Sequence, residues 1–517
     1  MNAKTGAPLW TNQVSAVSEF VGHTGQTSPV TDCAVGVGPA GQDMIFGGPN
    51  GSSSPLRGHM DGIDLKTGQL IWRWFTTPDP TQLPFILTWG NPAEAALGGG
   101  GTWGSSAIDP GLHMIYSQTG NAYAQLGRQP GKDLWTASTF ALDTRTGQLT
   151  WYWQEGHHDN WDLDHSHPPI LFNTTQTGHG STIYPTLLTC NKVANCEVLD
   201  RRNGSPLPNF PMKETPVFDY SGKGLALNAE YPTQPWFSCN SAQMGVNGVP
   251  AAQAASVHLG QTMPKGTACA MSYLIDHDYN DADGALVVAT YPVGTNGTPV
   301  VARPVFTSTY SDSYTLYPTC SCGYNYNRST YDPLTNSFIG CGNGNSAAQE
   351  NASPTDWHKN STGTVLGGVW ITSVDMASNT VNWQDFLWGE TYKNGVLTPG
   401  VNAGYTDGTW SKGCYGGNIS TAGNLLFLAS WGDASQGSTT SLTLAANRNW
   451  GGTLAAYNAS TGQGPLWTWQ SPGGQMNGSP MTYQVGGKQY VSIYTTLSPI
   501  GTAAYNGHGE QLVAFSL

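Results

Sequence analysis

The sequence predicts an all-β protein built as a β-propeller, and three observations lead to this fold class. A short phrase ending in tryptophan recurs along the chain, its early copies are spaced as one sheet per copy would require, and the composition is turn-rich. Of 517 residues, 66 are glycine and only 10% are charged, against roughly 25% in ordinary soluble domains. An aromatic content of 11% supplies core material, so disorder is not expected.

The recurring phrase places Asp or Asn before a Gly or Asn turn, and a tryptophan at the end of the apolar strand that follows. Its copies are "NAKTGAPLW" (2–10), "DLKTGQLIW" (64–72), "DTRTGQLTW" (143–151) and "NASTGQGPLW" (458–467), with a decayed copy in "DMASNTVNW" (375–383). A tight turn of this composition between two strands is typical of a hairpin. We therefore expect Trp10, Trp72, Trp151 and Trp467 to pack between neighbouring sheets.

The spacing of the repeat also predicts the domain organisation. Intervals of 62 and 79 residues between the early copies suit radially repeated four-stranded sheets, each packed only on its neighbours. Between 205 and 300 the pattern gives way to Pro, Gly and Asn, which indicates a long loop-rich elaboration. The prediction is one propeller domain over residues 1–517 that carries this elaboration.

Charge and cysteine content limit the partners and the compartment. The net charge is −13, so the cations that nucleic-acid binding needs are lacking, and no apolar run reaches the length of a membrane span. The nine cysteines form no CxxC motif, but "CNKVANC" (190–196) could staple a tight hairpin. This favours an extracytoplasmic location, periplasmic or secreted, although no signal peptide opens the sequence.

One short stretch concentrates titratable side chains. Residues 157–169 read "HHDNWDLDHSHPP", and one hypothesis is a zinc site formed by His157, His158, His165 and His167. These histidines lack the helical i, i+4 spacing of metallohydrolases. The alternative is a set of loop histidines that are hydrogen-bonded near the rim of a pocket.

Several phrases in a fixed order resemble the quinoprotein alcohol dehydrogenases. They are "GGGTWGSSAIDPGLHMIYSQTGN" (99–121), "NWDLD" (160–164), "GGNISTAGNLLF" (416–427) and "GSPMTYQVGGKQYVSIY" (478–494). The resemblance implies an eight-bladed propeller that binds pyrroloquinoline quinone (PQQ) and a Ca²⁺ or lanthanide ion near its axis. It also implies oxidation of a small or polymeric alcohol to an aldehyde or ketone, with electrons passing to an external acceptor such as a cytochrome c.

The resemblance assigns metal and catalytic roles to residues of the first half of the chain. Asn121 in "TGN" matches an amide ligand of the metal ion, for which oxygen donors are suited. Asp162 in "NWDLD" matches the catalytic base and a metal ligand. Asp164 lies two residues further on, on the same face of an extended segment, and matches the additional carboxylate of lanthanide-using relatives.

The resemblance also assigns cofactor contacts. Trp103 in "GGTW" matches the indole on which the quinone rests, and Lys192 matches the cation that contacts the quinone oxygens. Asn325 in "GYNYN" and Tyr415 in "CYGGN" match further cofactor contacts more loosely.

Two departures from the family pattern favour an alternative, a non-catalytic propeller that acts in binding or as a scaffold. Ser53 stands four residues before Arg57, where relatives carry a glutamate metal ligand. The family's vicinal cysteines and a cofactor-binding arginine precede the point at which this sequence starts. The sequence is therefore expected to be either an N-terminally shortened piece or an incomplete propeller.

Overall fold

The structure is a computed structural model, and it describes part of the chain. The described residues are 2, 4–11, 34–49, 55–79, 82–123, 129–159, 163, 165, 167–192, 194–216, 231–237, 263, 265–272, 290–291, 300–302, 315–318, 323–324, 327–343, 346–349, 368–393, 396–399, 414, 416–430, 452–471, 476, 478–495 and 511–516. They are organised almost entirely as antiparallel β-sheets, which confirms the all-β prediction.

The first three sheets each have four strands, joined in chain order. The first contains β1 (Ala34–Val37), β2 (Asp43–Gly47), β3 (His59–Asp64) and β4 (Leu70–Phe75). The second contains β5 (Ala107–Asp109), β6 (Met114–Gln118), β7 (Ser138–Asp143) and β8 (Leu149–Gln154), and the 3-10 helix η2 (Phe85–Thr88) and helix α1 (Pro92–Ala95) precede it. The third contains β9 (Ile170–Thr175), β10 (Ile183–Cys190), β11 (Cys196–Asp200) and β12 (Ser205–Pro206).

Three more sheets of the same kind follow later in the chain. One contains β18 (Thr330–Asp332), β19 (Ser337–Asn343), β21 (Gly368–Asp375), β22 (Thr380–Lys393) and β23 (Val396–Pro399). The next contains β24 (Asn418–Ser420), β25 (Leu425–Ser430), β26 (Thr453–Asn458) and β27 (Trp467–Gln470). The last contains β28 (Met481–Val485), β29 (Lys488–Thr495) and β30 (Gln511–Ser516).

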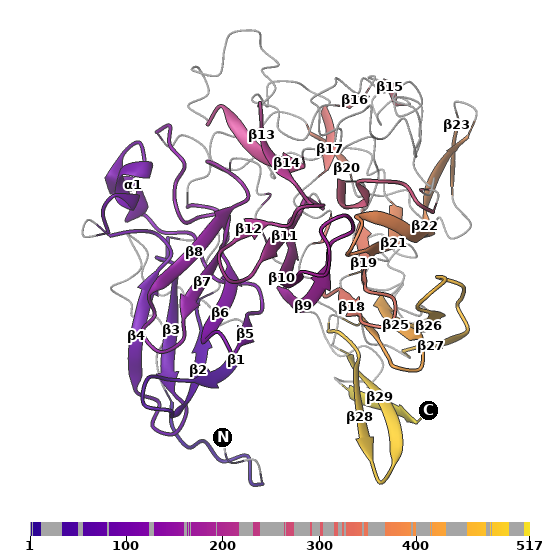
Figure 1. Cartoon of the computed structure of the whole chain (residues 1–517), viewed down its shortest axis with the longest axis horizontal. Helices are drawn as coiled ribbons and strands as arrows, with labels where there is room; N and C mark the ends of the chain where they lie inside the picture. The colour runs from indigo at the N-terminus through magenta and orange to yellow at the C-terminus, as the bar shows by residue number, and fades with distance from the viewer. Residues whose placement is uncertain are drawn as a thin grey trace, which may run out of the picture.

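Two smaller sheets come from the middle of the chain. They are β13 (Met212–Pro216) with β14 (Thr233–Phe237), and β15 (Thr290–Tyr291), β16 (Val300–Ala302), β17 (Thr315–Pro318) and β20 (Ser346–Gln349); the 3-10 helix η4 (Ala270–Ser272) lies between them in sequence. Figure 1 shows both sheets at the top of the molecule, above the other sheets. Most of the expected elaboration at 205–300 lies outside the described residues, so its extent stays a prediction.

The first strands of successive large sheets contact one another. β1 contacts β5, β5 contacts β9, β9 contacts β18, and β18 contacts β24. In Figure 1 the sheets follow the chain from the indigo side to the orange side in this order. Contact between innermost strands and packing of each sheet on its neighbours are the geometry of a β-propeller, as the repeat predicted.

The tryptophans of the repeat join neighbouring sheets. Trp72 donates its indole N–H to the carbonyl of Thr144 at 3.0 Å, and its ring lies against Gly147 in the next sheet's turn. Equivalent indole bonds run from Trp10 to Leu65, from Trp151 to Arg201 and from Trp383 to Ala459. Trp467 differs, because it packs edge-on against Phe515 of β30 and remains 39% exposed.

The repeated turns explain why Asp or Asn opens each phrase. The Oδ1 atom of Asp64 accepts bonds from the backbone N–H groups of Lys66 and Thr67, at 3.0 and 2.7 Å. Gly68 then adopts φ +74°, which a residue with a side chain rarely does. The same turn occurs at residues 200–204, a copy without a terminal tryptophan that the sequence reading missed.

The hydrophobic core is divided among the interfaces between sheets. One cluster joins Phe46 and Trp74 of the first sheet to Phe140 of the second, and another joins Tyr116 to Leu187 of the third.

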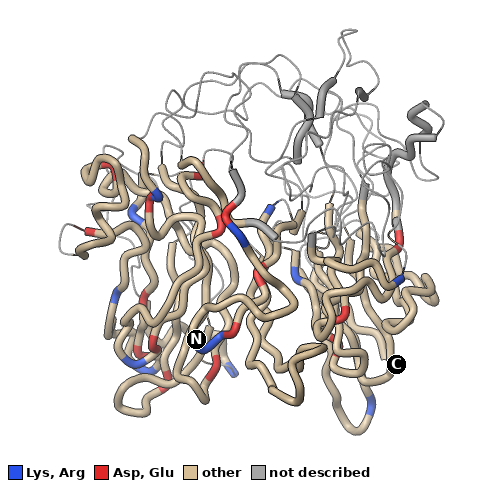
Figure 2. Tube along the Cα trace, turned by 45° about the horizontal axis from the view of Figure 1, so that its top comes forward, with Lys and Arg blue, Asp and Glu red and all other residues tan. Residues whose placement is uncertain are grey.

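Charged residues occupy short separate segments of the described trace (Figure 2). Among the described residues, no helix is long and apolar enough to cross a bilayer.

Candidate functional site

A run of glycines brings the Trp103 segment against Asn121. The N–H of Gly100 donates to the carbonyl of Asn121 at 2.8 Å, and the N–H of Gly120 donates to Gly101 at 2.9 Å. A Cβ on Gly99 would collide with the backbone nitrogen of Tyr123, so only glycine permits this approach. Asn121 is fully buried and Trp103 partly exposed, so two residues expected at the site lie on adjoining segments.

Lys192 lies beside Trp103. Its Nζ is 4.9 Å from the centroid of the indole, a cation–π contact. Lys192 is only 5% exposed and sits in the loop between β10 and β11, which the disulfide Cys190–Cys196 closes. This disulfide confirms the hairpin staple expected from "CNKVANC", and it restrains the segment that carries the lysine.

Asn325 and Tyr415 lie outside the described residues, but their described neighbours approach the lysine loop. The N–H of Tyr324 donates to the carbonyl of Asn191 at 3.2 Å, and Gly323 exchanges backbone bonds with Asn343. The Oδ1 atom of Asn343 in turn accepts from the N–H of Cys414 at 3.0 Å, and Cys414 is joined to Cys341 by a disulfide. Residues 323–324 therefore contact the lysine loop directly, and Asn343 and Cys414 connect to it through them.

Asp162 and Asp164 also lie outside the described part of the chain, as does Ser53. Leu163, between the two aspartates, is buried, and its N–H donates to Oδ2 of Asp159 at 2.9 Å. Asp159 had no role in the sequence reading. Its carboxylate is itself buried and holds the backbone N–H of Leu163.

The four histidines of residues 157–167 contact different partners. His157 lies 3.0 Å from Glu214 and 2.7 Å from Gln154, and His158 lies 2.8 Å from Asp133. All four are buried rather than placed at a rim: His157, His158, His165 and His167. They do not converge on one point, so a zinc site made of these histidines does not form.

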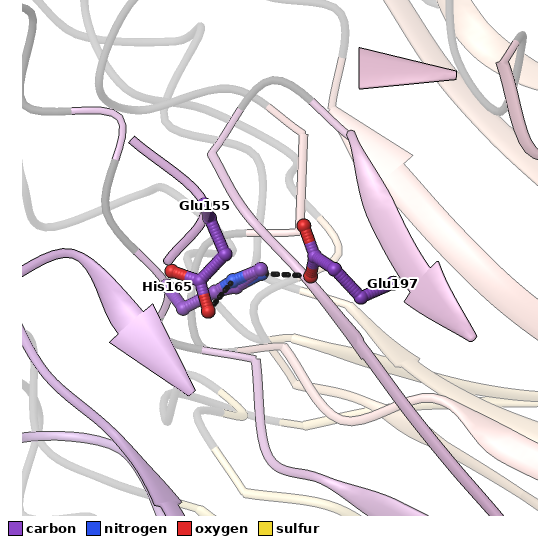
Figure 3. Close-up of side chains that lie close together, drawn as sticks. All are labelled: Glu155, His165 and Glu197. Carbon is purple, nitrogen blue, oxygen red and sulfur yellow. Dashed lines mark ion pairs between the residues drawn. The ribbon is translucent and has the colours of Figure 1, made fainter. Parts of the chain in front are cut away.

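His165 lies between two carboxylates (Figure 3). Its Nδ1 is 3.1 Å from Oε1 of Glu155, and its Nε2 is 2.5 Å from Oε2 of Glu197. Burial, followed by the charges of His167 and Lys192, holds the pKa of His165 well below its ordinary value. Burial and the neighbouring charge of Glu155 raise the pKa of Glu197 well above its ordinary value.

His167 occupies a different buried environment. Burial lowers its pKa to about 3, and its ring meets that of Tyr324 edge-on, with the ring centroids 5.6 Å apart. Gln118 donates to the carbonyl of His167 and to Oγ1 of Thr189, at 2.6 and 2.7 Å. These bonds connect the histidine segment to the second and third sheets.

Two features of this region escaped the sequence reading. Glu155 and Glu197 come from separate sheets, and the only available signal was the appearance of two acidic residues beside apolar strands in a chain with few charges. Arg328 donates to Oγ of Ser105 at 2.7 Å across 223 residues of sequence, which joins the Trp103 segment to the β18–β23 sheet. No sequence pattern pointed to that contact.

Comparison with known families gives one match over most of the chain. Residues 40–491 match the family described as "Glucose/ethanol/alcohol dehydrogenase, beta-propeller domain", a PQQ family. The chain is 31% identical over 246 residues to a quinohemoprotein alcohol dehydrogenase of Comamonas testosteroni, covering 44% of this chain and 33% of that protein. It is 27% identical over 511 residues to a quinoprotein glucose dehydrogenase of Escherichia coli (strain K12), covering 90% and 55%.

Comparison with solved structures supports the same fold. A europium-containing methanol dehydrogenase superposes with a TM-score of 0.51 and 19% identity, over 88% of this chain and 64% of that one. A quinohemoprotein alcohol dehydrogenase of Pseudomonas putida HK5 gives a TM-score of 0.51 at 19% identity, over 90% and 55%. The chain thus spans from a third to just over half of the length of the two curated relatives named above.

Proposed function

Because the chain belongs to the family of PQQ-dependent dehydrogenase propellers, we propose that it oxidises an alcohol to an aldehyde or ketone with PQQ and a Ca²⁺ or lanthanide ion. The observation that carries this proposal is the pairing of Lys192 with Trp103. Nζ of Lys192 lies 4.9 Å from the indole centroid, and the lysine is almost fully buried. A buried ammonium beside a partly exposed indole is suited to a flat, anionic quinone.

The residues present fit the expected cofactor and ion. Trp103 offers an aromatic face for stacking, and Lys192 offers a positive charge toward the oxygens of the quinone. Asn121 offers a buried amide oxygen to a hard cation, with Asp162 and Asp164 as the proposed carboxylate ligands. Asn325 and Tyr415 are proposed as further cofactor contacts.

The proposed reaction divides the work between the cofactor and the chain. When bound, PQQ supplies a two-electron acceptor and the ion supplies a Lewis acid. Asp162 acts as the general base that removes the proton of the alcohol hydroxyl. Asp159 supports it by holding the backbone of Leu163, and Lys192 stabilises negative charge near Trp103.

The proposed setting follows from the disulfides and from the family. Cys190–Cys196 and Cys341–Cys414 are bonds that persist in oxidising compartments, which supports a periplasmic or secreted protein. The proposed substrate is a small or polymeric alcohol, and the proposed electron acceptor is a separate protein such as a cytochrome c.

Reconstitution with PQQ tests the proposal. The chain is incubated with PQQ and Ca²⁺ or La³⁺, and alcohol-dependent reduction of an artificial dye is followed. Asp162→Asn should keep PQQ bound but lose about 10²–10⁴ in turnover, because general base catalysis is removed. Asp164→Ala should reduce activity with La³⁺ more than with Ca²⁺, because a trivalent ion needs the additional carboxylate.

Lys192→Met tests the observation that carries the proposal. Loss of a charge-assisted contact of about 1.5–3 kcal/mol should weaken PQQ binding by about 10- to 100-fold, as measured by fluorescence titration. Lys488→Met is the matched control, because Lys488 also lies over an aromatic ring, 6.0 Å from the centroid of Tyr490, but is exposed. Absence of PQQ binding and of dye reduction with every alcohol would support a non-catalytic propeller instead.

A further inference from the structure

Glu155, His165 and Glu197 form a buried cluster that the proposed alcohol oxidation does not use. Glu155 follows β8, Glu197 lies in β11, and His165 lies in the segment that connects β8 to β9. Figure 3 shows the three side chains directed toward one another from these separate elements. Their exposed fractions are 1%, 0% and 0%, so solvent does not screen the two carboxylates.

The distances fit a shared cation. One ligand atom from each residue lies within 4.8 Å of the ligand atoms of the other two. The ligand atoms of a tetrahedral ion with bonds of about 2.0–2.2 Å lie about 3.3–3.6 Å apart, so the imidazole and one carboxylate would have to shift by about 1 Å to close the cluster on an ion. Among the described residues, this is the one group of three or more such side chains with this spacing.

The hydrogen bonding also points to a missing cationic partner. An imidazole with one proton can donate to only one of the two carboxylates beside it. Neither carboxylate oxygen of Glu197 accepts a hydrogen bond of good geometry from the described residues, although Oε2 lies 2.5 Å from His165. A buried carboxylate of this kind is costly unless a proton or a cation neutralises it, and a bound ion would satisfy both oxygens.

Glu155 is oriented as a ligand carboxylate is expected to be. Oγ1 of Thr139 donates to its Oε1 at 2.6 Å, which fixes the carboxylate toward His165. Hydrogen bonds of this type to the outer side of a ligand are typical of metal sites. Thr139 lies in β7, so the second sheet supplies both the ligand Glu155 and the residue that holds it.

We propose that Glu155, His165 and Glu197 bind a divalent transition-metal ion, with Zn²⁺ the best fit. One imidazole nitrogen with carboxylate oxygens suits Zn²⁺ or Mn²⁺, whereas Ca²⁺ and lanthanide ions prefer oxygen ligands alone.

The site would serve as a structural clamp. Its ligands belong to the second sheet, to the third sheet and to the loop that carries "DLD", so an ion bound there would hold these three parts together. Complete burial leaves no open face for a substrate, as in structural rather than catalytic zinc sites. The proposal does not depend on PQQ or on the oxidation of alcohol.

Metal analysis of the purified chain tests the site. The chain without PQQ is incubated with Zn²⁺ in the presence of excess Ca²⁺, which occupies oxygen-only sites, then desalted and measured by inductively coupled plasma mass spectrometry. We expect about one Zn²⁺ per chain, and an unfolding midpoint that rises with Zn²⁺ and falls with chelator. Cobalt substitution should give the visible absorption bands of a low-symmetry Co²⁺ site.

Two variants make the result specific. Glu197→Gln should remove the bound Zn²⁺, whereas Glu214→Gln should keep it, because Glu214 is paired with His157 at 3.0 Å but its side chain is 51% exposed. His165→Gln serves as a second test if Glu197→Gln does not fold. Wild-type protein without Zn²⁺ after incubation, or folded variants of Glu197 and His165 with as much Zn²⁺ as wild type, would overturn the proposal. Failure of PQQ to bind leaves these measurements unaffected, so the two proposals fail separately.

Discussion

At the scale of single residues, burial and pairing determine how the ionisable side chains behave. Glu214 accepts from Oγ1 of Thr233 at 2.7 Å and lies beside the buried imidazole of His157. The hydrogen bond with His157, against a smaller opposing effect of burial, lowers the pKa of Glu214 from 4.5 to about 2. A carboxylate exposed to solvent on one side is thus tied to the histidine-rich segment.

This pairing predicts that the stability of the folded protein falls at acidic pH. The folded pKa of Glu214 is depressed, so its stabilisation is present above about pH 4.5 and is lost as the pH falls toward about 2. Solvent screening keeps the contribution below about 1 kcal/mol. Glu214→Gln should therefore flatten the fall in urea-unfolding midpoint between these pH values, and an unchanged slope would contradict the pairing.

Three buried acidic residues show that residues of the same type take different roles according to where they lie in the fold. Asp159, Glu155 and Glu197 are each at most 1% exposed, but their contacts differ. Asp159 holds a backbone N–H, whereas the two glutamates flank an imidazole. The sequence presents all three simply as acidic residues, because identity alone does not reveal burial or partners.

At the scale of elements, a tryptophan and a glycine join the first sheet to the second, the second to the third, and the β18–β23 sheet to the β24–β27 sheet. The glycine at the end of each turn takes a positive φ, and the indole of the preceding sheet lies against it. The pairs are Trp10 with Gly68, Trp72 with Gly147, Trp151 with Gly204 and Trp383 with Gly462. A side chain at the glycine would therefore act on an interface between sheets and not only on one turn.

Gly147→Ala tests this contact. A Cβ at Gly147 would lie 2.6 Å from the indole of Trp72, and the backbone has φ +69°. Overpacking and the left-handed backbone together should cost about 2–4 kcal/mol, read from the denaturant midpoint. Gly180→Ala is the matched control, since it has the same φ of +69° with nothing within 4 Å, and should cost only about 1–2 kcal/mol. Equal losses would show that the indole contact contributes nothing.

The loop between β10 and β11 is the element that links fold and site. A disulfide closes it, Lys192 lies beside Trp103, and Glu197 is the second residue of β11, the strand that follows it. A Cβ on Gly323 would approach the carbonyl of Lys192 to 2.5 Å, so glycine is needed where the two segments meet. The sequence reading found the lysine and the disulfide here, but not the segment packed against them.

At the scale of the whole molecule, the net charge influences encounters with partners. The chain carries 20 Lys and Arg against 33 Asp and Glu, a net charge of −13. A field of this sign attracts basic proteins and repels acidic ones. For the proposed dehydrogenase, the electron acceptor is therefore expected to be a cationic protein.

Ionic strength tests this expectation. With PQQ-loaded protein, the second-order rate of reduction of a basic cytochrome c should fall at least several-fold between about 0.01 and 0.5 M salt, because salt screens the attraction. The rate with an uncharged dye should change little over the same range. An equal salt dependence for both acceptors would exclude electrostatic steering by this chain.

Much of the molecule could be predicted because its repeat is local. The Asx turn, the glycine at positive φ and the strand-ending tryptophan lie within about ten residues, so the local sequence of each copy is enough to predict its hairpin. Motif order then led to Trp103, Asn121 and Lys192, which the structure places on adjoining segments. Asp162, Asp164, Asn325 and Tyr415 stay predictions, because they lie outside the described residues.

The sequence alone therefore determined the all-β propeller and the tryptophans that join its sheets, whereas the cofactor residues it names stay predictions. Only the tertiary structure decided which partners the histidines of 157–167 receive, and that His165 lies between Glu155 and Glu197. The physical reason is that a repeat depends on residues close together in the sequence, whereas a buried cluster brings together residues from different sheets. Its energetics depend on burial and distance, which sequence spacing does not encode.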